Sequence, residues 1–201
     1  GVRLVGSEMC IRDSNIWDFT NFVGEKKGKI FKSAPEFTNN KFFDECKINY
    51  AENCLTRDDD DDAIIFHSEK KIKRNYSWRE LKSAVLKFAN YLKNNNIEKN
   101  DRIAAILPNI PETVISFLST AQLGAIWSSC SSDFGKKAII DRFKQIEPKV
   151  LLFSDYYFYN NKKVDTTKII KDVVYNIPSI EKIILIPCLL YTSDAADDRC
   201  C

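Results

Sequence analysis

The feature that most constrains the fold is an alternation, from residue 63 onward, of short apolar segments with longer segments of helical periodicity. The apolar segments cover residues 102–107, 125–129, 149–154 and 182–187. The helical patterns between them cover residues 111–123, 134–147 and 166–177. Short apolar strands that alternate with helices are typical of βαβ units around a parallel sheet. The sequence therefore predicts an α/β fold with a mostly parallel sheet and flanking helices.

Several residues indicate where helices of this pattern begin and end. Ser77 and Glu80 have the spacing of a capping box, after a predicted strand pair at 63–69 and 71–77. Pro111 is placed just inside the next helix, where a missing N–H costs nothing, and Gly124 marks its end. The core-facing residues predicted for the first helix are Leu81, Val85, Phe88, Ala89 and Leu92.

The two ends of the chain share an unusual origin. The DNA string GAGATGTGTATAAGAGACAG encodes residues 8–13 and the start of Ser14, and its reverse complement, read one base out of phase, encodes residues 188–193. One element read on both strands predicts that residues 1–14 and 188–201 are translated sequencing-adaptor scars, and such segments are excluded from fold reasoning. We expect the natural protein to occupy residues 15–187, to be open at both ends, and the scars to have no fixed packing.

Composition excludes several classes of protein once the scars are removed. The whole chain carries a net charge of +2; residues 1–14 are neutral and residues 188–201 carry −2, which leaves +4 spread over the remainder. A nucleic-acid-binding protein would show a concentrated basic face, and no apolar run reaches the length of a membrane helix. We therefore expect neither nucleic acid nor membrane as a partner. The three remaining cysteines, with no CxxC spacing, favour a cytoplasmic protein over a disulfide or zinc framework.

Individual residues offer little catalytic chemistry. The run Asp58–Asp62 lacks the spaced oxygens and glycine of a calcium loop, so a solvated loop is the preferred interpretation. His67 is interpreted as a half-buried structural residue, and Cys46, Cys54 and Cys130 as small core residues. The sequence contains neither GxxxxGK nor GxGxxG. We therefore assign no catalytic and no metal-binding residue.

Longer strings carry a resemblance that extends over nearly all of residues 15–187. They are KINYAENCL (47–55), DRIAAILPNIPETVISFLSTAQLGAIWSSCSSDFG (101–135), DRFKQIEPKVLLFSD (141–155) and YNNKKVD (159–165). In this order they resemble the acetoacetyl-CoA synthetases, a family of the adenylate-forming acyl-CoA synthetase superfamily. The string LPNIPE is similar to strings of many adenylating enzymes, whereas GAIWSSCSSDFG is the part that resembles this family specifically. Residues 16–55 resemble the N-terminal extension of the acetyl- and acetoacetyl-CoA synthetases.

The resemblance implies a fold and a reaction. It implies an N-terminal extension over residues 15–62 and an incomplete AMP-binding (adenylation) domain over residues 63–187. It also implies that acetoacetate reacts with ATP to give an acyl-adenylate and pyrophosphate, and that CoA then displaces AMP, with Mg²⁺ as a cofactor. The family's phosphate loop, nucleotide contacts and catalytic lysine lie downstream of the matching residues. We therefore expect the parent to be an acid–thiol ligase and this chain to be inactive by itself.

The resemblance also implies two CoA-binding segments. In the related acetyl-CoA synthetases, the loop after the strand that matches 125–129 lines the CoA channel, which corresponds here to Ser131, Ser132 and Asp133. A YNGK string with CoA-binding residues corresponds to Tyr159, Asn160, Lys162 and Lys163, and Asn161 replaces its glycine. The alternatives are helix capping by Ser132 or Asp133 and solvated lysines on a turn. Because parallel strands gather their carboxyl ends, we expect both segments on one rim of the sheet.

Two other functions stay open at this stage. One is a sister ligase that acts on acetate or propionate, since no residue of the chain identifies the acyl group. The other is a non-catalytic flavodoxin-like binding module, which the α/β alternation alone also allows.

Overall fold

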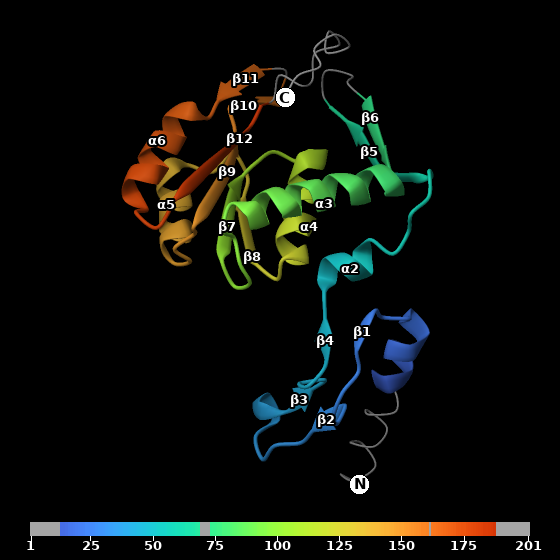
Figure 1. Cartoon of the computed structure of the whole chain (residues 1–201). Helices are drawn as coiled ribbons and strands as arrows, with labels where there is room; N and C mark the ends of the chain where they lie inside the picture. The colour runs from blue at the N-terminus through green and yellow to red at the C-terminus, as the bar shows by residue number, and fades with distance from the viewer. Residues whose placement is uncertain (1–12, 69–72, 161, 188–201) are drawn as a thin grey trace. The chain divides into compact units, whose positions relative to one another are not determined.

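The computed structural model describes residues 13–68, 73–160 and 162–187 of the chain (Figure 1). The chain divides into two compact units, Gly1–Thr56 and Arg57–Cys201. The second unit contains the predicted sheet.

The second unit is built on a four-stranded parallel sheet in the order β12-β9-β7-β8. Its strands are β7 (Arg102–Ile106), β8 (Ile126–Cys130), β9 (Val150–Ser154) and β12 (Lys182–Ile186). Its long helices are α3 (Trp78–Asn94), α4 (Pro111–Gln122), α5 (Lys136–Lys144) and α6 (Thr167–Asn176). In Figure 1, α3 and α4 lie on one side of the sheet and α5 and α6 on the other. This arrangement confirms the predicted α/β class with a parallel sheet and flanking helices.

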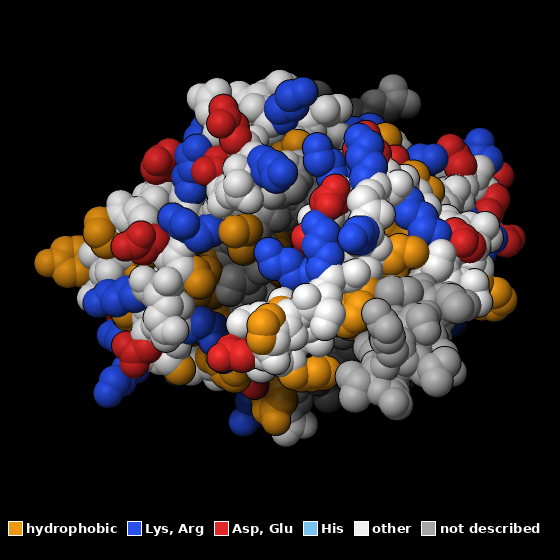
Figure 2. Space-filling view, turned by 90° about the horizontal axis from the view of Figure 1, so that it is seen from below, with side chains coloured by type: hydrophobic (Ala, Val, Ile, Leu, Met, Phe, Trp, Pro, Cys, Tyr) orange, Lys and Arg blue, Asp and Glu red, His pale blue; other side chains and the backbone are white. Residues whose placement is uncertain are grey.

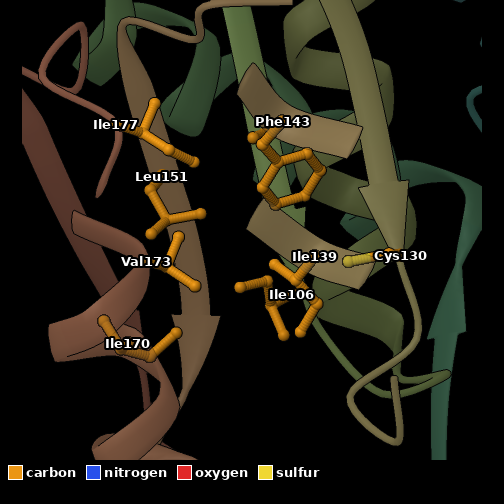
Figure 3. Packing of buried hydrophobic residues seen from close by; sticks show 9 residues of the cluster. Ile106, Cys130, Ile139, Phe143, Leu151, Ile170, Val173 and Ile177 are labelled. Carbon is orange, nitrogen blue, oxygen red and sulfur yellow. The ribbon is translucent and has the colours of Figure 1, made fainter. Parts of the chain in front are cut away.

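The central strand β7 contributes to a hydrophobic core on each face of the sheet. Ile103 and Ala105 belong to a buried cluster with Leu92 of α3, whereas Ala104 and Ile106 belong to a cluster with residues of α5 and α6. Successive side chains of a strand point to opposite faces, so a strand covered on both sides is apolar throughout. The second cluster (Figure 3) consists of Ala104, Ile106, Cys130, Ile139, Phe143, Leu151, Ile170, Val173 and Ile177.

The helix signals in the sequence are confirmed where they were clearest. The Ser77 side chain accepts a hydrogen bond from the Glu80 N–H, and the Glu80 side chain accepts one from the Ser77 N–H, which completes the capping box of α3. Pro111 is the first residue of α4, and Gly124 beyond its end has a φ of +68°. The backbones of α3 and α4 approach each other closely: the buried Ser119 hydroxyl of α4 donates a hydrogen bond to the Val85 carbonyl of α3 at 2.9 Å.

Two antiparallel hairpins accompany the sheet. The first, β5 (Asp62–His67) with β6 (Lys73–Ser77), was predicted with slightly different bounds. The second, β10 (Tyr156–Tyr159) with β11 (Lys162–Asp165), was not predicted, because its residues were interpreted as a turn. It follows β9 after one residue and leads into α6, so it lies at the carboxyl end of the sheet (Figure 1).

The first unit contains short elements held together by aromatic side chains. Residues 13–20 are helical, followed by β1 (Gly24–Glu25), β2 (Phe31–Lys32), a 3₁₀ turn η1 (Phe37–Asn39), β3 (Lys41–Phe42), β4 (Lys47–Ile48) and α2 (Tyr50–Cys54). Trp17 packs against Phe22 and Phe43, and the Asn53 side chain bonds the Val23 backbone on both its N–H and its C=O, at 2.9 Å each. Figure 2 shows hydrophobic side chains exposed on one face of the molecule, among acidic and basic ones.

Some expectations for single residues are corrected. His67, expected to be half-buried, is exposed at the end of β5. Cys130 is buried as predicted, whereas Cys46 and Cys54 are only partly buried. The aspartate run is largely exposed, yet Arg57 pairs with Asp59 and Asp61, and other members pair with Arg79 and Lys82 of α3. The run therefore ties its loop to the first turns of α3 as well as being solvated.

No helix within the described ranges is both long and apolar enough to cross a bilayer. The predicted scars at 1–12 and 188–201 lie outside the described residues. Of the remaining two scar positions, Ser14 accepts a hydrogen bond from Lys26 Nζ at 3.0 Å on the exposed surface.

Candidate functional site

The carboxyl ends of β7, β8 and β9 form one rim of the sheet, where the sequence predicted both CoA-binding segments. Ile106 pairs with Cys130 of β8 on one side and with Phe153 of β9 on the other, so these three strands end at the same level. The loop 131–135 follows β8 and the β10–β11 hairpin follows β9. Because β7 alone separates β8 from β9, the two segments start roughly 10 Å apart on one rim. The expectation that they share a rim is confirmed.

This rim also contains the point where the chain reverses direction across the sheet. Helix α4 connects β7 to β8 over one face, and α5 connects β8 to β9 on the other side of β7 over the opposite face. Open α/β sheets bind ligands in the crevice outside the carboxyl ends of strands at such switch points. The position is therefore suited to a ligand independently of which residues occupy it.

The loop after β8 places its three candidate residues in different environments. Ser131 and Asp133 are exposed, whereas Ser132 is only 4% exposed and its hydroxyl has no hydrogen-bond partner in the described part of the chain. The N-cap of α5 is Gly135, with no side-chain cap, so the alternative that Ser132 or Asp133 caps this helix is wrong. Arg142 of α5 stacks over Phe134, 5.3 Å from the ring centre, and so braces the loop against the helix.

The hairpin after β9 carries the second candidate segment. Tyr159 pairs with Lys162 at its tip, and Asn160 has a φ of +50°, which asparagine tolerates better than most residues. Tyr159, Lys162 and Lys163 are exposed. Asn161, where the sequence departs from the family string, lies outside the described residues.

Alternation along the hairpin separates the two lysines. Tyr157 and Tyr159 share one face with Lys162, and Phe158, which pairs with Lys163, shares the other face with Tyr156. On the Lys163 face, the ammonium lies 3.8 Å from the centre of the Tyr156 ring. This contact is a cation–π interaction.

The Tyr156 face of the hairpin packs into an apolar cluster above the sheet. Tyr156 is 6% exposed and clusters with Ile110, which follows β7, and with Phe66 and Ile186. Phe158 contacts Tyr156 edge-on, with ring centres 5.5 Å apart. This packing fixes the orientation of the hairpin relative to the strand ends.

The Tyr157 face is electrostatically linked to the loop after β8. Burial, and next the negative charge of Asp133, raise the pKa of Tyr157. Asp133 also acts on Cys130, whose pKa is raised to about 11 chiefly by burial, so this thiol stays protonated at neutral pH and is no nucleophile.

The rim can therefore offer an anion a small set of groups. Within the described residues Lys162 takes part in no ion pair, and the Ser132 hydroxyl is buried without a partner. The exposed Lys162 ammonium beside the strand ends suits phosphate oxygens, whereas the enclosed Ser132 hydroxyl is not accessible to a ligand in this conformation. The described ranges contain no group of three or more His, Cys, Asp or Glu residues that could hold a metal ion.

Comparison with known proteins identifies the family. A family model described as AMP-binding enzyme matches residues 51–197. The chain belongs to this family.

Two relatives of the chain are named acetoacetyl-CoA synthetases. The chain is 39% identical to an acetoacetyl-coenzyme A synthetase of Rhizobium meliloti over 158 residues, which cover 79% of this chain and 24% of the relative. It is 34% identical to an acetoacetyl-CoA synthetase of Xenopus tropicalis over 184 residues, 87% of this chain and 26% of that protein. The chain thus spans about a quarter of the length of these relatives.

A solved AMP-binding structure matches the fold. The acetoacetyl-CoA synthetase from Streptomyces lividans superposes with a TM-score of 0.86 at 28% identity, over 96% of this chain and 30% of that one. Membership of the AMP-binding family and this superposition exclude the flavodoxin-like alternative.

Sequence reasoning missed the groups that orient the site. Tyr156 and the Arg142–Phe134 stack were not singled out, because their roles depend on contacts across elements. The signal for the hairpin was present, however: two asparagines separate an aromatic segment from Lys162-Lys163-Val164, and Asn-rich two-residue turns favour hairpins.

Proposed function

We propose that this chain is part of a ligase that activates acetoacetate with ATP and transfers the acyl group to CoA, giving acetoacetyl-CoA, AMP and pyrophosphate. The family, and relatives that are named acetoacetyl-CoA synthetases over most of this chain, support the reaction. The cytoplasm is the proposed location, and small molecules are the proposed partners. ATP and Mg²⁺ belong to the proposal, but we assign neither to a residue of this chain.

Within that reaction we propose that the rim contributes to the CoA entrance. The observation that carries this assignment is the convergence of the loop 131–133 and the β10–β11 hairpin at one end of the parallel sheet. Lys162 has no ion-pair partner in the described ranges and would meet a CoA phosphate, while Ser131 and Ser132 belong to the loop on the same rim. Tyr159, Asn160 and Asp133 complete the proposed lining, and Lys163 belongs to the same segment.

The reaction is tested by extending the gene downstream and assaying the longer protein. We expect pyrophosphate exchange into ATP that depends on acetoacetate, and AMP formation that depends also on CoA. The 201-residue chain serves as the control and should release no pyrophosphate above a protein-free sample, because its sequence lacks a glycine-rich phosphate loop. Acetoacetate-dependent pyrophosphate release by the short chain would contradict the assignment of adenylation to other residues.

The choice of acid is tested in the same assay. Acetate and propionate are the competing substrates, since the sister ligases use them. We expect kcat/KM for acetoacetate to exceed both. A preference for acetate or propionate would overturn the acyl assignment and leave the CoA assignment standing.

A further inference from the structure

The two adjacent lysines of the hairpin cannot serve one ligand in the same way. In β11, Lys162 and Lys163 are consecutive, and consecutive side chains of a strand point to opposite faces. The cross-strand pairs Tyr159 with Lys162 and Phe158 with Lys163 fix which face each occupies. Any ligand on the rim therefore meets at most one of the two faces directly.

Lys163 already has a partner on its own face. Its ammonium lies 3.8 Å from the centre of the Tyr156 ring, and that ring is buried among Ile110, Phe66 and Phe158. A cation over an aromatic face gains electrostatic energy from the ring quadrupole. If Lys163 bound a phosphate on the other face, it would lose this contact. Its side chain would also have to cross the strand, because β11 points it to the Tyr156 face.

Lys162 has the opposite surroundings. It shares its face with Tyr157 and Tyr159, away from the Tyr156 ring. It forms no ion pair with the described residues, and it is exposed. Its ammonium is therefore available to a ligand on the face of the hairpin opposite the Tyr156 ring.

We propose that the two lysines have separate roles: Lys162 makes the anion contact of the candidate site, and Lys163 is a positioning residue that fixes the hairpin through the Tyr156 ring. The inference rests on the proposed function, since the anion is taken to be a phosphate of CoA. Lys162 acts as a point charge, whereas Lys163 acts only by holding the strand that presents Lys162.

Binding of CoA to the 201-residue chain, measured by calorimetry at low and high NaCl concentration, separates the two roles. Lys162→Ala should raise the Kd for CoA about fivefold and flatten its dependence on salt, because the variant removes a screened charge–charge contact. Lys163→Ala should raise the Kd only about twofold and keep the wild-type salt dependence. Lys163→Arg should restore wild-type binding, since arginine also stacks on aromatic rings. Lys171→Ala, an exposed lysine of α6, is the matched control and should bind as the wild type does.

A second measurement examines Lys163 without any ligand. In NMR spectra of the free chain, the Lys163 side-chain methylene signals should be shifted upfield by the ring current of Tyr156, and those of Lys162 should not. Absence of the Lys163 shift would overturn its positioning role.

The binding outcomes distinguish this inference from the proposed function. If Lys163→Ala flattens the salt dependence as much as Lys162→Ala does, the division of roles is wrong while the CoA site stands. If the wild-type chain does not bind CoA at all, the assignment of the rim to CoA is wrong, and the anion role of Lys162 is wrong with it.

Discussion

The Asp101 side chain links the segments that precede β7 and β9 at the amino end of the sheet. Its carboxylate accepts hydrogen bonds from the Glu98 N–H at 2.8 Å and from Lys149 Nζ at 2.9 Å, and Lys149 also donates to the Asn96 carbonyl at 2.8 Å. Burial opposes ionisation of Asp101, but these donors outweigh it and hold the pKa of Asp101 below its usual value. One side chain thereby fastens the start of β7 to the start of β9.

We expect acid to weaken this contact. A carboxyl group whose folded pKa is lowered stabilises the protein above its unfolded pKa, and the contribution is lost as the pH falls through the folded pKa. Between about pH 6 and about pH 3, the wild type should lose about 1 kcal/mol more free energy of unfolding than Asp101→Asn. Urea unfolding across this range measures the difference. Asp141→Asn, an exposed carboxylate of α5, should keep the wild-type profile, whereas identical profiles for wild type and Asp101→Asn would contradict the assignment.

At the scale of elements, one ion pair links the β5–β6 hairpin to α4. Arg74 of β6 donates to both carboxylate oxygens of Glu112, at 2.7 and 2.9 Å, and both side chains are about one-fifth exposed. The Arg74 guanidinium also lies over the Phe66 and Tyr76 rings. Bidentate geometry and partial burial make such a pair worth more than an exposed one.

Breaking the pair should loosen the hairpin more than the sheet. Glu112→Gln should lower the free energy of unfolding by about 1–2 kcal/mol, between the values for exposed and buried pairs, because a partly buried guanidinium loses its charge partner. Hydrogen exchange should accelerate in β5 and β6 and stay unchanged in β7 and β9. Asp172→Asn, which breaks the half-exposed pair with Lys136, is the matched control and should change stability by less than about 0.5 kcal/mol. Equal effects of the two variants would refute the link.

The elements that the sequence predicts well are those whose pattern reflects burial or capping. Strands β7 and β9 are apolar on both faces, and the α3 capping box requires only local hydrogen bonds. The β10–β11 hairpin was missed although two asparagines mark its turn, because Tyr156 and Phe158 pack against partners distant in sequence, Phe66 and Ile110. The prediction that Ser132 or Asp133 caps α5 was wrong, because the loop after β8 continues to Gly135 before the helix begins.

The candidate site was predictable in position but not in geometry. Strand ends and a family string located Ser131–Asp133 and Tyr159–Lys163, and parallel pairing then placed them on one rim. Which lysine lies over the Tyr156 ring depends on the register of a hairpin that the sequence did not predict. Neither charge nor spacing distinguishes Lys162 from Lys163, so only the pairing of β10 with β11 could separate them.

At the scale of the whole molecule, the adaptor origin of both ends stays a prediction, because residues 1–12 and 188–201 lie outside the described residues. The buried clusters of the second unit draw their residues from between Phe66 and Ile186. Of the scar residues that the structure describes, Ser14 accepts an exposed hydrogen bond from Lys26. The boundary between extension and adenylation domain at residues 62 and 63 stays a prediction; the compact units divide after Thr56.

Because one DNA element accounts for both ends, removing both predicted scars should leave the fold unchanged. We expect a chain of residues 15–187 to keep the circular dichroism spectrum of the 201-residue chain and its Tm, apart from a small cost of about 0.5 kcal/mol for the exposed contacts of Asp13 and Ser14. A chain of residues 13–187 is the matched comparator, because it retains the Ser14–Lys26 contact and the first turn of the helix at 13–20. If both shortened chains melt well below the 201-residue chain, residues 1–12 or 188–201 contribute to the core and the adaptor interpretation of the ends is wrong. If only the 15–187 chain is destabilised, the structural boundary lies at residue 13 and not at residue 15.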